Sequence, residues 1–313
     1  MSTQTQTETD STRRGFVSRL RASPFLSDLL SNRLALAGIA LILAMVAVAL
    51  YARIGALVGF APTYAELQSS QFGANPSLAA PSAEYPFGTD IQARNIFDRV
   101  LYGSWLALKF GTVTVGISTA AGVSLGVVAA YYGDITDNVI MRTMDVLLAF
   151  PSLLLALALV AIFPNELGLW RAVTALTLVY TPRFARVVRG AALKVLEDEY
   201  VDATIALGAT DPRVLVRHVM PNCLAPITVQ STLNFGLAII DLAALSFLGF
   251  GAEPGSPSWG LMLSNGVSQG LLTGDWWWSF FPGLFLAVTV LGFNLLGDGM
   301  RDALDPRMRE AVD

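Results

Sequence analysis

A long, mostly apolar stretch in the last third of the chain contains one charged residue, Asp241, and the amide side chain of Asn234, and these two are the first candidates for chemistry. Asp241 and Asn234 both lie within residues 226–250, which are mostly apolar. A carboxylate inside such a stretch costs roughly 2.5–3.5 kcal/mol on membrane-insertion scales and is by default a candidate for function. Asp241 could attract the ammonium group of a solute or a bound cation, or it could make a structural or gating contact. If this stretch spans a membrane, Asp241 and Asn234 are the candidate residues of a pathway across it.

The other polar side chains do not suggest a catalytic centre. His218 is the single histidine and Cys223 the single cysteine, which excludes an internal disulfide and a zinc-type cluster. No nucleophile accompanies His218. Neither Lys109 nor Lys194 follows a glycine, so the chain has no phosphate-binding Gly-Lys-Ser/Thr loop. We therefore expect no catalytic residue, no cofactor, no metal and no nucleic-acid partner, and any ATP must be bound by another polypeptide.

The composition indicates a membrane protein with an all-α fold. The chain is 54% hydrophobic and 14% charged, with a mean hydropathy of +0.56. Its 313 residues have room for about six spans of roughly 20 residues each. Pro151 should kink the third span, and snorkelling arginines should lengthen the short fourth one. The six expected spans are residues 34–58, 101–132, 139–163, 172–182, 226–250 and 276–297. Glycines in the second span, at 103, 111, 116, 122 and 126, should let it approach other helices closely.

The basic residues predict the orientation of these spans. Most of the 20 Lys and Arg residues fall in segments that are cytoplasmic if the N-terminus is inside, and residues 251–275 contain none. We expect both termini in the cytoplasm. The expected divisions are a tail at 1–33, disordered over 1–12, a first transmembrane helix at 34–58, an extracytoplasmic loop at 59–100, a five-helix domain at 101–298, and a cytoplasmic tail at 299–313.

One polar segment, residues 199–222, lies between apolar spans and is here named the finger. A helix is expected over residues 193–207, because its apolar positions recur at helical spacing. Gly208 allows a turn, and Asp211 followed by Pro212 signals a second helix start. This second helix should run to about Met220 and end at Pro221. The sequence therefore predicts a helix-turn-helix between the fourth and fifth spans, on the cytoplasmic side.

Several separated motifs carry a family resemblance. The finger contains Asp202-Ala203-Thr204, then Gly208, then His218-Val219-Met220-Pro221. This pattern resembles the EAA loop of ABC-importer permeases, with Asp for Glu, Thr for Ala and Met for Leu. The chain resembles in particular the C-type permease of the dipeptide/oligopeptide/nickel branch. The other matching motifs are YPFGTD at 85–90, DVLLAFPSLLLALALV at 145–160, LSFLGFG at 245–251, SPSWG at 256–260 and FNLLGDGMRDALDPR at 293–307.

The resemblance also has departures in the outer region. The family pattern after FGTD is Gly-Arg-Asp, where this chain has Ala93-Arg94-Asn95, and Trp105 stands where a later arginine is expected. The family carries an acid at the position of Asp241 whatever its cargo, which favours a structural or gating role for that residue. Docking or gating properties of the outer region are therefore not carried over.

The resemblance implies the function and the partners. The chain would be a prokaryotic cytoplasmic-membrane permease in lipid, paired with a second permease, two ATP-binding-cassette ATPase subunits and an extracytoplasmic solute-binding protein. Di- or oligopeptides are the expected cargo, with nickel or another small solute as the alternative. The finger would couple ATP-driven closure to gate movement. The expected ATPase-coupling residues are Glu199, Tyr200, Asp202, Ala203, Gly208, Ala209, Asp211, Pro212, Arg217, His218 and Pro221.

Other expectations rest on the residues themselves. An ion-coupled secondary transporter would usually show inverted repeats and several intramembrane coupling groups, and neither is found. Asp145 should pair with Arg142. The arginines at 183, 186 and 189 share one helix face and should pair with Glu197 or Asp198, or bind lipid headgroups. Residues 276–278, three tryptophans, should form an interfacial belt or contact a solute-delivery protein.

Overall fold

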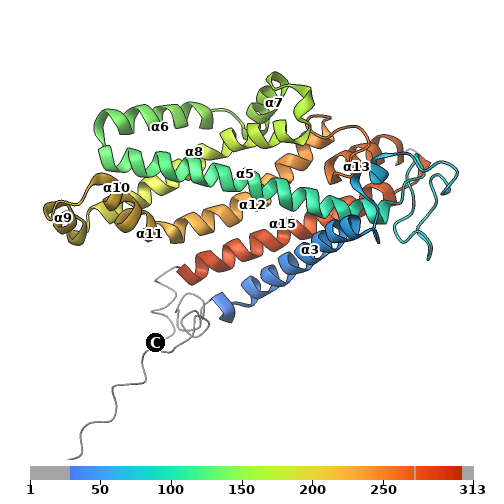
Figure 1. Ribbon diagram of the computed structural model, residues 1–313, viewed down its shortest axis with the longest axis horizontal. Helices are drawn as coiled ribbons and strands as arrows, with labels where there is room; N and C mark the ends of the chain where they lie inside the picture. Colours follow the sequence, from blue (N-terminus) through green and yellow to red (C-terminus); the bar gives the residue numbers. More distant parts are fainter. Residues whose placement is uncertain (1–28, 271–272, 305–313) are drawn as a thin grey trace, which may run out of the picture.

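A computed structural model describes residues 29–270 and 273–304 of the chain. The segment expected to be disordered, residues 1–12, and the basic residues at 13–21 and 307–309 lie outside the described residues. Within the described part the regular secondary structure is helical, with two isolated bridges in residues 59–95. This segment is here named the outer loop, only after its expected extracytoplasmic position. The expectation of an all-α fold is confirmed for this part of the chain (Figure 1).

Four helices are long and apolar enough to cross a membrane, and their bounds are close to those expected. They are α3 (Arg33–Val58), α5 (Ile96–Tyr132), α12 (Leu224–Phe247) and α15 (Trp277–Leu304). The start of α3 is capped by Asn32, whose side chain accepts from the backbone N–H groups of Leu34 and Ala35. Asn95 caps α5 in the same way through Phe97. These caps explain why both helices begin where they do.

The third expected span is not one helix. It divides into α6 (Asp134–Leu148) and α7 (Ser152–Ile162), which are bent by 94° relative to each other. The break lies at Pro151, which has extended ψ and disfavours helical geometry at Phe150 before it. A kink inside a continuous helix was therefore too mild an expectation. Together the two helices could make a fifth apolar crossing or a re-entrant segment.

The fourth expected span is much longer than its apolar centre. Helix α8 (Leu169–Leu196) has 28 residues and continues through Pro182. At 1.5 Å per residue it is about 42 Å long. It is less apolar than the other long helices, because arginines and a lysine occupy its second half. Its length comes from packing against α5 and not from hydrophobicity alone.

Close packing of α5 against α8 forms the centre of the bundle. A methyl group on Gly122 would lie 2.8 Å from the carbonyl oxygen of Thr181, and one on Gly126 would lie 2.5 Å from the carbonyl oxygen of Ala185. These two glycines allow the helix backbones to approach, as small residues do in membrane bundles. Gly116, on the same helix, faces open space instead and makes no such approach to another described helix.

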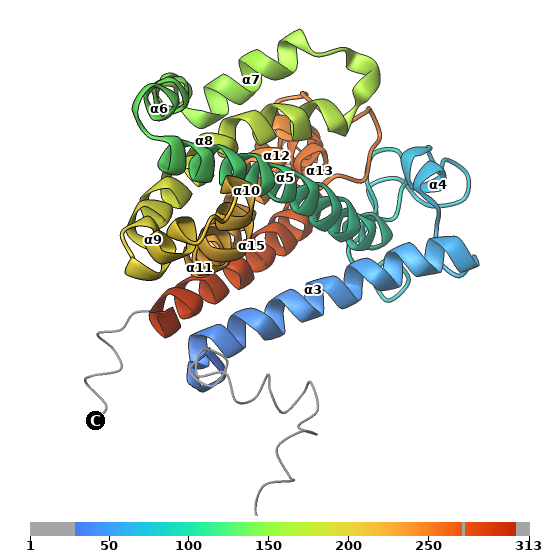
Figure 2. The same ribbon diagram turned by 60° about the vertical axis from the view of Figure 1, so that its left-hand side comes forward.

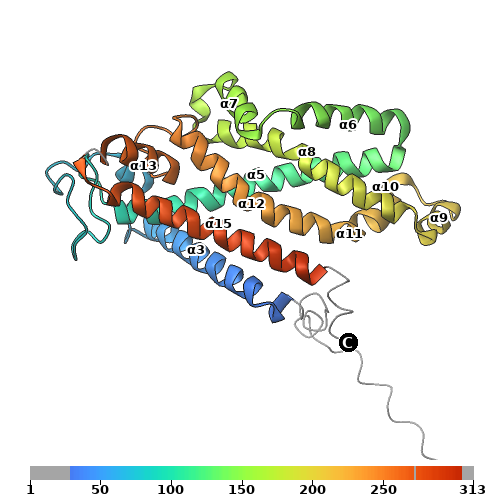
Figure 3. The same cartoon turned by 180° about the vertical axis from the view of Figure 1, so that it is seen from behind.

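The helices place different structures at the two ends of the bundle (Figures 1 and 3). The finger, the start of α3 and the end of α15 lie at one end. The short helices α4 (Tyr64–Gln68) and α13 (Trp259–Asn265) lie at the other end with the long loop before α5. Figure 2 shows α3 on the opposite side of the bundle from α6 and α7. The finger therefore lies at the same end as the start of α3 and the end of α15.

Candidate coupling finger and translocation pathway

The finger has a different helical division from the expected one. A turn at Glu197 and Asp198 separates α8 from α9 (Glu199–Ala206), so residues 193–207 are not one helix. Gly208 then adopts a positive φ of 84°, which is the turn expected there. After it come α10 (Asp211–Val214), the π-helix η2 (Leu215–Val219) and α11 (Met220–Asn222).

Pro221 does not end the second helix of the finger. It lies in the first turn of α11, and only a turn at Cys223 separates α11 from α12. The backbone N–H of Met220 reaches back to the carbonyl oxygen of Leu215, a π-type bond that shifts the hydrogen-bond ladder just before the proline. The π-turn accommodates the missing N–H of Pro221, so the chain runs almost directly from the finger into α12.

Buried apolar residues fix the finger to the bundle. Val201, Val214 and Val219 of the finger are fully buried, as is Cys223 just after it, in a cluster that includes Val188 of α8. Each side of the turn at Gly208 therefore has at least one buried anchor. The finger is packed as a continuation of α8 and α12 and is not a loose connection between them.

Tyrosine hydroxyls add polar contacts to this packing. Tyr131 and Tyr132, at the end of α5, donate hydrogen bonds of 2.8 and 3.2 Å to the two carboxylate oxygens of Asp211. Within the finger, the Nδ2 group of Asn222 donates to the Tyr200 hydroxyl at 2.8 Å and to the His218 carbonyl at 2.7 Å. His218 thus takes part through its backbone, which gives no support to a catalytic imidazole.

The tip of the finger is exposed and partly apolar. Leu207 is 89% exposed, and Ile205 and Val216 are also exposed. Leu207 and Ile205 lie beside the turn at Gly208, and Val216 lies in η2. None of the three was among the expected coupling residues, although exposed apolar residues can mark a binding surface. Most of the expected residues lie on the exposed part too: Glu199, Tyr200, Asp202, Ala203, Gly208, Asp211, Pro212, Arg217 and Pro221. Ala209 and His218 are half-buried.

The two candidate pathway residues lie seven positions apart on α12 and therefore on one face of that helix. Asp241 is half-buried and accepts a 2.7 Å hydrogen bond from the buried Tyr180 hydroxyl of α8. The guanidinium of Arg183 lies over the Tyr180 ring, 5.2 Å from its centroid. Asn234 is 1% exposed, and neither of its side-chain polar atoms has a hydrogen-bond partner among the described residues. Both residues lie between helices, not on the outer surface.

The ion pairs on the finger side differ from those expected. Asp145 pairs with Arg186 at 2.6 Å and not with Arg142. Arg189 makes two bonds of 2.5 Å to Asp137 and does not pair with Glu197 or Asp198. These pairs join α8 to α6, because the chain reversal after α5 places α6 along α8. The expectation considered only neighbours in the sequence.

Two buried arginines connect the outer loop to residues 255–256, and their burial was not expected. Arg99 is 1% exposed and donates to the carbonyl oxygens of Leu67, of Gly255 at 3.0 Å and of Ser256 at 3.1 Å. Arg94 pairs with Asp90 at 2.7 Å. Both arginines lie in or beside a polar stretch of sequence, which carries no signal of burial.

The tryptophans at 276–278 also belong to this outer structure. Trp277 and Trp278 are buried, and the Trp277 indole donates to the Thr89 carbonyl at 3.4 Å. Only Trp276 of the three is exposed. The prediction that all three tryptophans form an interfacial belt is therefore wrong.

Helix α4 begins with a reciprocal pair of contacts. The Thr63 backbone N–H and hydroxyl donate to the Glu66 carboxylate, and these bonds hold the pKa of that carboxyl below its usual value.

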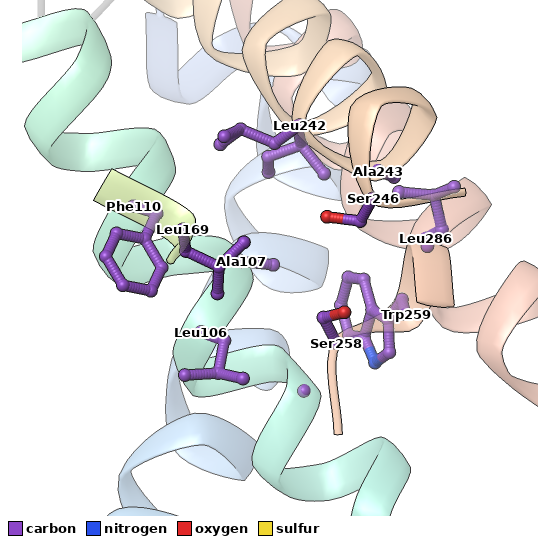
Figure 4. Close-up of a pocket in the computed structure, with 13 residues that line it drawn as sticks. Leu106, Ala107, Phe110, Leu169, Leu242, Ala243, Ser246, Ser258, Trp259 and Leu286 are labelled. Atoms are coloured by element: carbon purple, nitrogen blue, oxygen red, sulfur yellow. The ribbon is translucent and has the colours of Figure 1, made fainter. Parts of the chain in front are cut away.

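A small apolar cavity lies between α5, α12 and the α13 region (Figure 4). Its volume is about 40 Å³, and Leu106, Phe110, Leu242 and Trp259 are among its lining residues. The two serine hydroxyls at its wall are buried. It is too small for a peptide. Among the described residues no group of His, Cys, Asp and Glu side chains is placed to hold a metal.

Comparisons with known proteins agree with this architecture. Residues 122–310 match the family described as binding-protein-dependent transport system inner membrane component. The dipeptide transport system permease protein DppC of Alkalihalophilus pseudofirmus is 42% identical over 90% of this chain and 88% of its own length. The di/tripeptide transport system permease protein DppC of Pseudomonas aeruginosa is 40% identical, over 81% of this chain and 84% of its own length.

A solved structure supports the fold. A chain of the MetNI methionine ABC transporter, in an inward-facing conformation, matches with a TM-score of 0.52 and 18% identity, covering 67% of this chain and 98% of that one. The expected family is confirmed. The chain is therefore a member of the binding-protein-dependent transport system inner membrane component family, a multi-pass ABC transporter permease.

Proposed function

We propose that this chain is one of two permease subunits in an ATP-driven importer of di- or oligopeptides. The names of its relatives support the cargo class. In this proposal α8 and the α6–α7 pair complete six spans with α3, α5, α12 and α15 in a prokaryotic cytoplasmic membrane. Both termini and the finger are cytoplasmic. Two ATPase subunits act on the finger, and an extracytoplasmic binding protein delivers the peptide.

The observation that carries the coupling role is the combination of an exposed tip and buried anchors in the finger. Leu207 projects into solvent, whereas Val201 and Val214 on either side of the turn are fully buried. A force applied at the tip would therefore be transmitted to α8 and α12 as a rigid movement. To move such a gate from 1:99 to 99:1 requires about 5.5 kcal/mol of differential binding.

Substitution of Leu207 tests this role. Because the Leu207 side chain is almost fully exposed, Leu207→Glu should leave insertion and folding intact. It should reduce co-purification of the ATPase subunits and ATP-dependent peptide uptake in proteoliposomes by about tenfold or more, the effect of losing a central apolar anchor. Phe72→Glu is the matched control, since Phe72 is an exposed apolar residue in the outer loop. Normal ATPase binding and normal uptake by Leu207→Glu would refute the coupling role of the tip.

A further inference from the structure

A second, larger pocket lies at the outer end of the bundle, far along α5 from the finger. Its volume is about 270 Å³, close to the lower limit of roughly 300 Å³ for small-ligand clefts. It lies between α3, α5, the start of α8 and the loop before α13. The lining residues that matter are Arg53, Lys109, Glu253, Tyr64, Trp105 and Trp170. None of them belongs to the finger or to the Asp241 contact.

Lys109 places a positive charge well inside a spanning helix. It lies 13 residues after Ile96, which is about 20 Å along α5. Its ammonium nitrogen is 5.0 Å from the ring centroid of Phe110 and 5.6 Å from that of Trp170. In the described part of the chain no carboxylate lies within ion-pair distance of it. Charged residues at such depth usually face a cavity and mark a functional site.

Arg53 brings a second positive charge to the same pocket. Its guanidinium carbon lies 5.7 Å from the ring centroid of Trp105, and it too forms no ion pair with a described carboxylate. Trp105 is the residue that stands where the family resemblance predicts an arginine. Aromatic faces stabilise a cation, but they do not neutralise it. Neither aromatic contact supplies a negative charge to balance the two cations at the pocket.

The only acidic side chain among the pocket's lining residues is Glu253. It makes a weak contact of 3.5 Å with the amide of Gln68 and, among the described residues, no ion pair with either cation. Two cations and one carboxylate leave the pocket with a net positive charge. Burial raises the pKa of the nearby Tyr64 phenol, so this group stays neutral and adds no negative charge. The pocket therefore has the chemistry of an anion site with aromatic walls.

We propose that Arg53 and Lys109 bind the anionic group of a small amphiphilic molecule, a carboxylate or a phosphate diester, whose apolar part lies against Trp105 and Trp170. A carboxylate would come from a peptide, whose ammonium group could then approach Glu253. A phosphate diester would come from an anionic lipid. The peptide source rests on the proposed function, whereas the lipid source does not.

Binding measurements without ATP test this site separately from transport. The full chain, assembled with its transporter subunits, is placed in neutral phosphatidylcholine nanodiscs. Saturation-transfer NMR then measures the binding of two probes, alanyl-alanine and its C-terminal amide. In parallel, native mass spectrometry counts phosphatidylglycerol molecules retained from mixed-lipid nanodiscs. The variants are Arg53→Gln, Lys109→Gln, the double variant and the charge-conserving Lys109→Arg, with Lys194→Gln as control for loss of a distant exposed lysine.

Each result has one interpretation. If the site holds a peptide carboxylate, the alanyl-alanine signal falls about tenfold in the double variant, as expected for loss of charge-assisted bonds. Lys109→Arg and Lys194→Gln then keep the signal, and the amide binds weakly throughout. If the site holds a lipid, retained phosphatidylglycerol falls in the double variant and the dipeptide signal does not.

Unchanged binding of both probes in the double variant would overturn the proposal, as would an equal loss in Lys194→Gln. Should the double variant not assemble, Arg53→Gln alone is read by the same criteria. Because neither measurement uses ATP or uptake, a failed anion site would leave the importer assignment intact. If the chain proved not to be an importer subunit, the binding measurements could still be interpreted.

Discussion

The hydroxyl of Tyr180 donates a 2.7 Å hydrogen bond to the carboxylate of Asp241 and so joins α8 to α12 inside the bundle. These are the two long helices between which the finger is inserted, since α8 ends just before α9 and α12 begins just after α11. A polar contact between them would respond to any movement of the finger. The Tyr180–Asp241 pair therefore fits a gating contact better than a solute-binding role for the Asp241 carboxylate.

Two substitutions separate a gating contact from a solute contact. Tyr180→Phe removes the hydroxyl that donates to the Asp241 carboxylate. An unsatisfied buried group of this kind lowers the free energy of unfolding by about 1–3 kcal/mol. Asp241→Asn keeps an acceptor for the hydroxyl and removes the charge. We expect Asp241→Asn to lower peptide uptake severalfold without preventing assembly of the complex. We expect Tyr180→Phe to lower thermal stability more than Asp241→Asn does.

The measurements are uptake in proteoliposomes and thermal unfolding of the purified complex. Thr174→Val serves as the control on α8, because the Thr174 hydroxyl bonds to the backbone of its own helix. Uptake kinetics of Asp241→Asn that match those of the unmodified protein would remove Asp241 from both roles.

Asp211 should hold the finger against the end of α5. It accepts hydrogen bonds from both Tyr131 and Tyr132. Asp211→Ala removes both bonds, and Tyr132→Phe removes only the longer one. We expect faster amide hydrogen exchange over residues 209–215 in Asp211→Ala, a smaller change in Tyr132→Phe, and reduced uptake in the same order. Equal exchange rates in all three proteins would show that the tyrosines do not anchor the finger.

Arg99 should be essential for the outer structure. Its guanidinium satisfies three carbonyl oxygens from two separate segments. Arg99→Met has a similar volume but leaves these acceptors unpaired, which costs about 1–3 kcal/mol for each buried group. We expect a lower unfolding temperature of the complex and easier proteolysis of residues 59–95. Arg142→Met, at an exposed position, is the control and should change neither.

The sequence predicted the long helices well because their apolar runs are continuous and their caps are local. It predicted the charged and broken helices poorly. The residues of α8 after Pro182 are too charged to be assigned to a membrane span by composition, and packing against α5 continues them in one helix with the apolar residues before Pro182. Pro151 breaks a span and Pro221 does not, and the difference lies in the π-turn before Pro221. No local rule distinguishes these two prolines.

The site was predictable to the extent that its residues are adjacent in the sequence. The turn at Gly208 and the helix start at Asp211-Pro212 were expected and are present. The partners of Asp241, Asp145 and Asp211 come from other helices, 61, 41 and 80 positions away. Their identification needs the tertiary arrangement. The same applies to the pocket at Lys109, whose charge looked incidental in an apolar helix.

The contact between α5 and α8 gives a prediction with a control on the same helix. A valine at Gly122 would collide with the backbone of α8 near Thr181 and Ala185. Overpacking of this kind costs about 1–3 kcal/mol or more. Gly116→Val has open space and should be tolerated. Thermal unfolding and expression level of the two variants check this directly, and equal stability would mean that α5 and α8 are less closely packed than described.

The turn at Gly208 allows the sharpest test of coupling. Its φ of 84° strains any side chain, and no atom lies within 4 Å of the position that a methyl group would take, so the effect of Gly208→Val would be conformational and not steric. A β-branched residue there costs about 1–3 kcal/mol of backbone strain, which α9 and α10 can avoid by changing their relative angle.

For Gly208→Val we expect normal membrane insertion, continued ATP hydrolysis and loss of peptide uptake. Gly190→Val is the matched control, because Gly190 also faces open space but has a helical backbone. The ratio of peptide imported to ATP hydrolysed, measured in proteoliposomes, should fall in Gly208→Val alone. A normal ratio in that variant would mean that the angle between α9 and α10 does not transmit the ATPase movement.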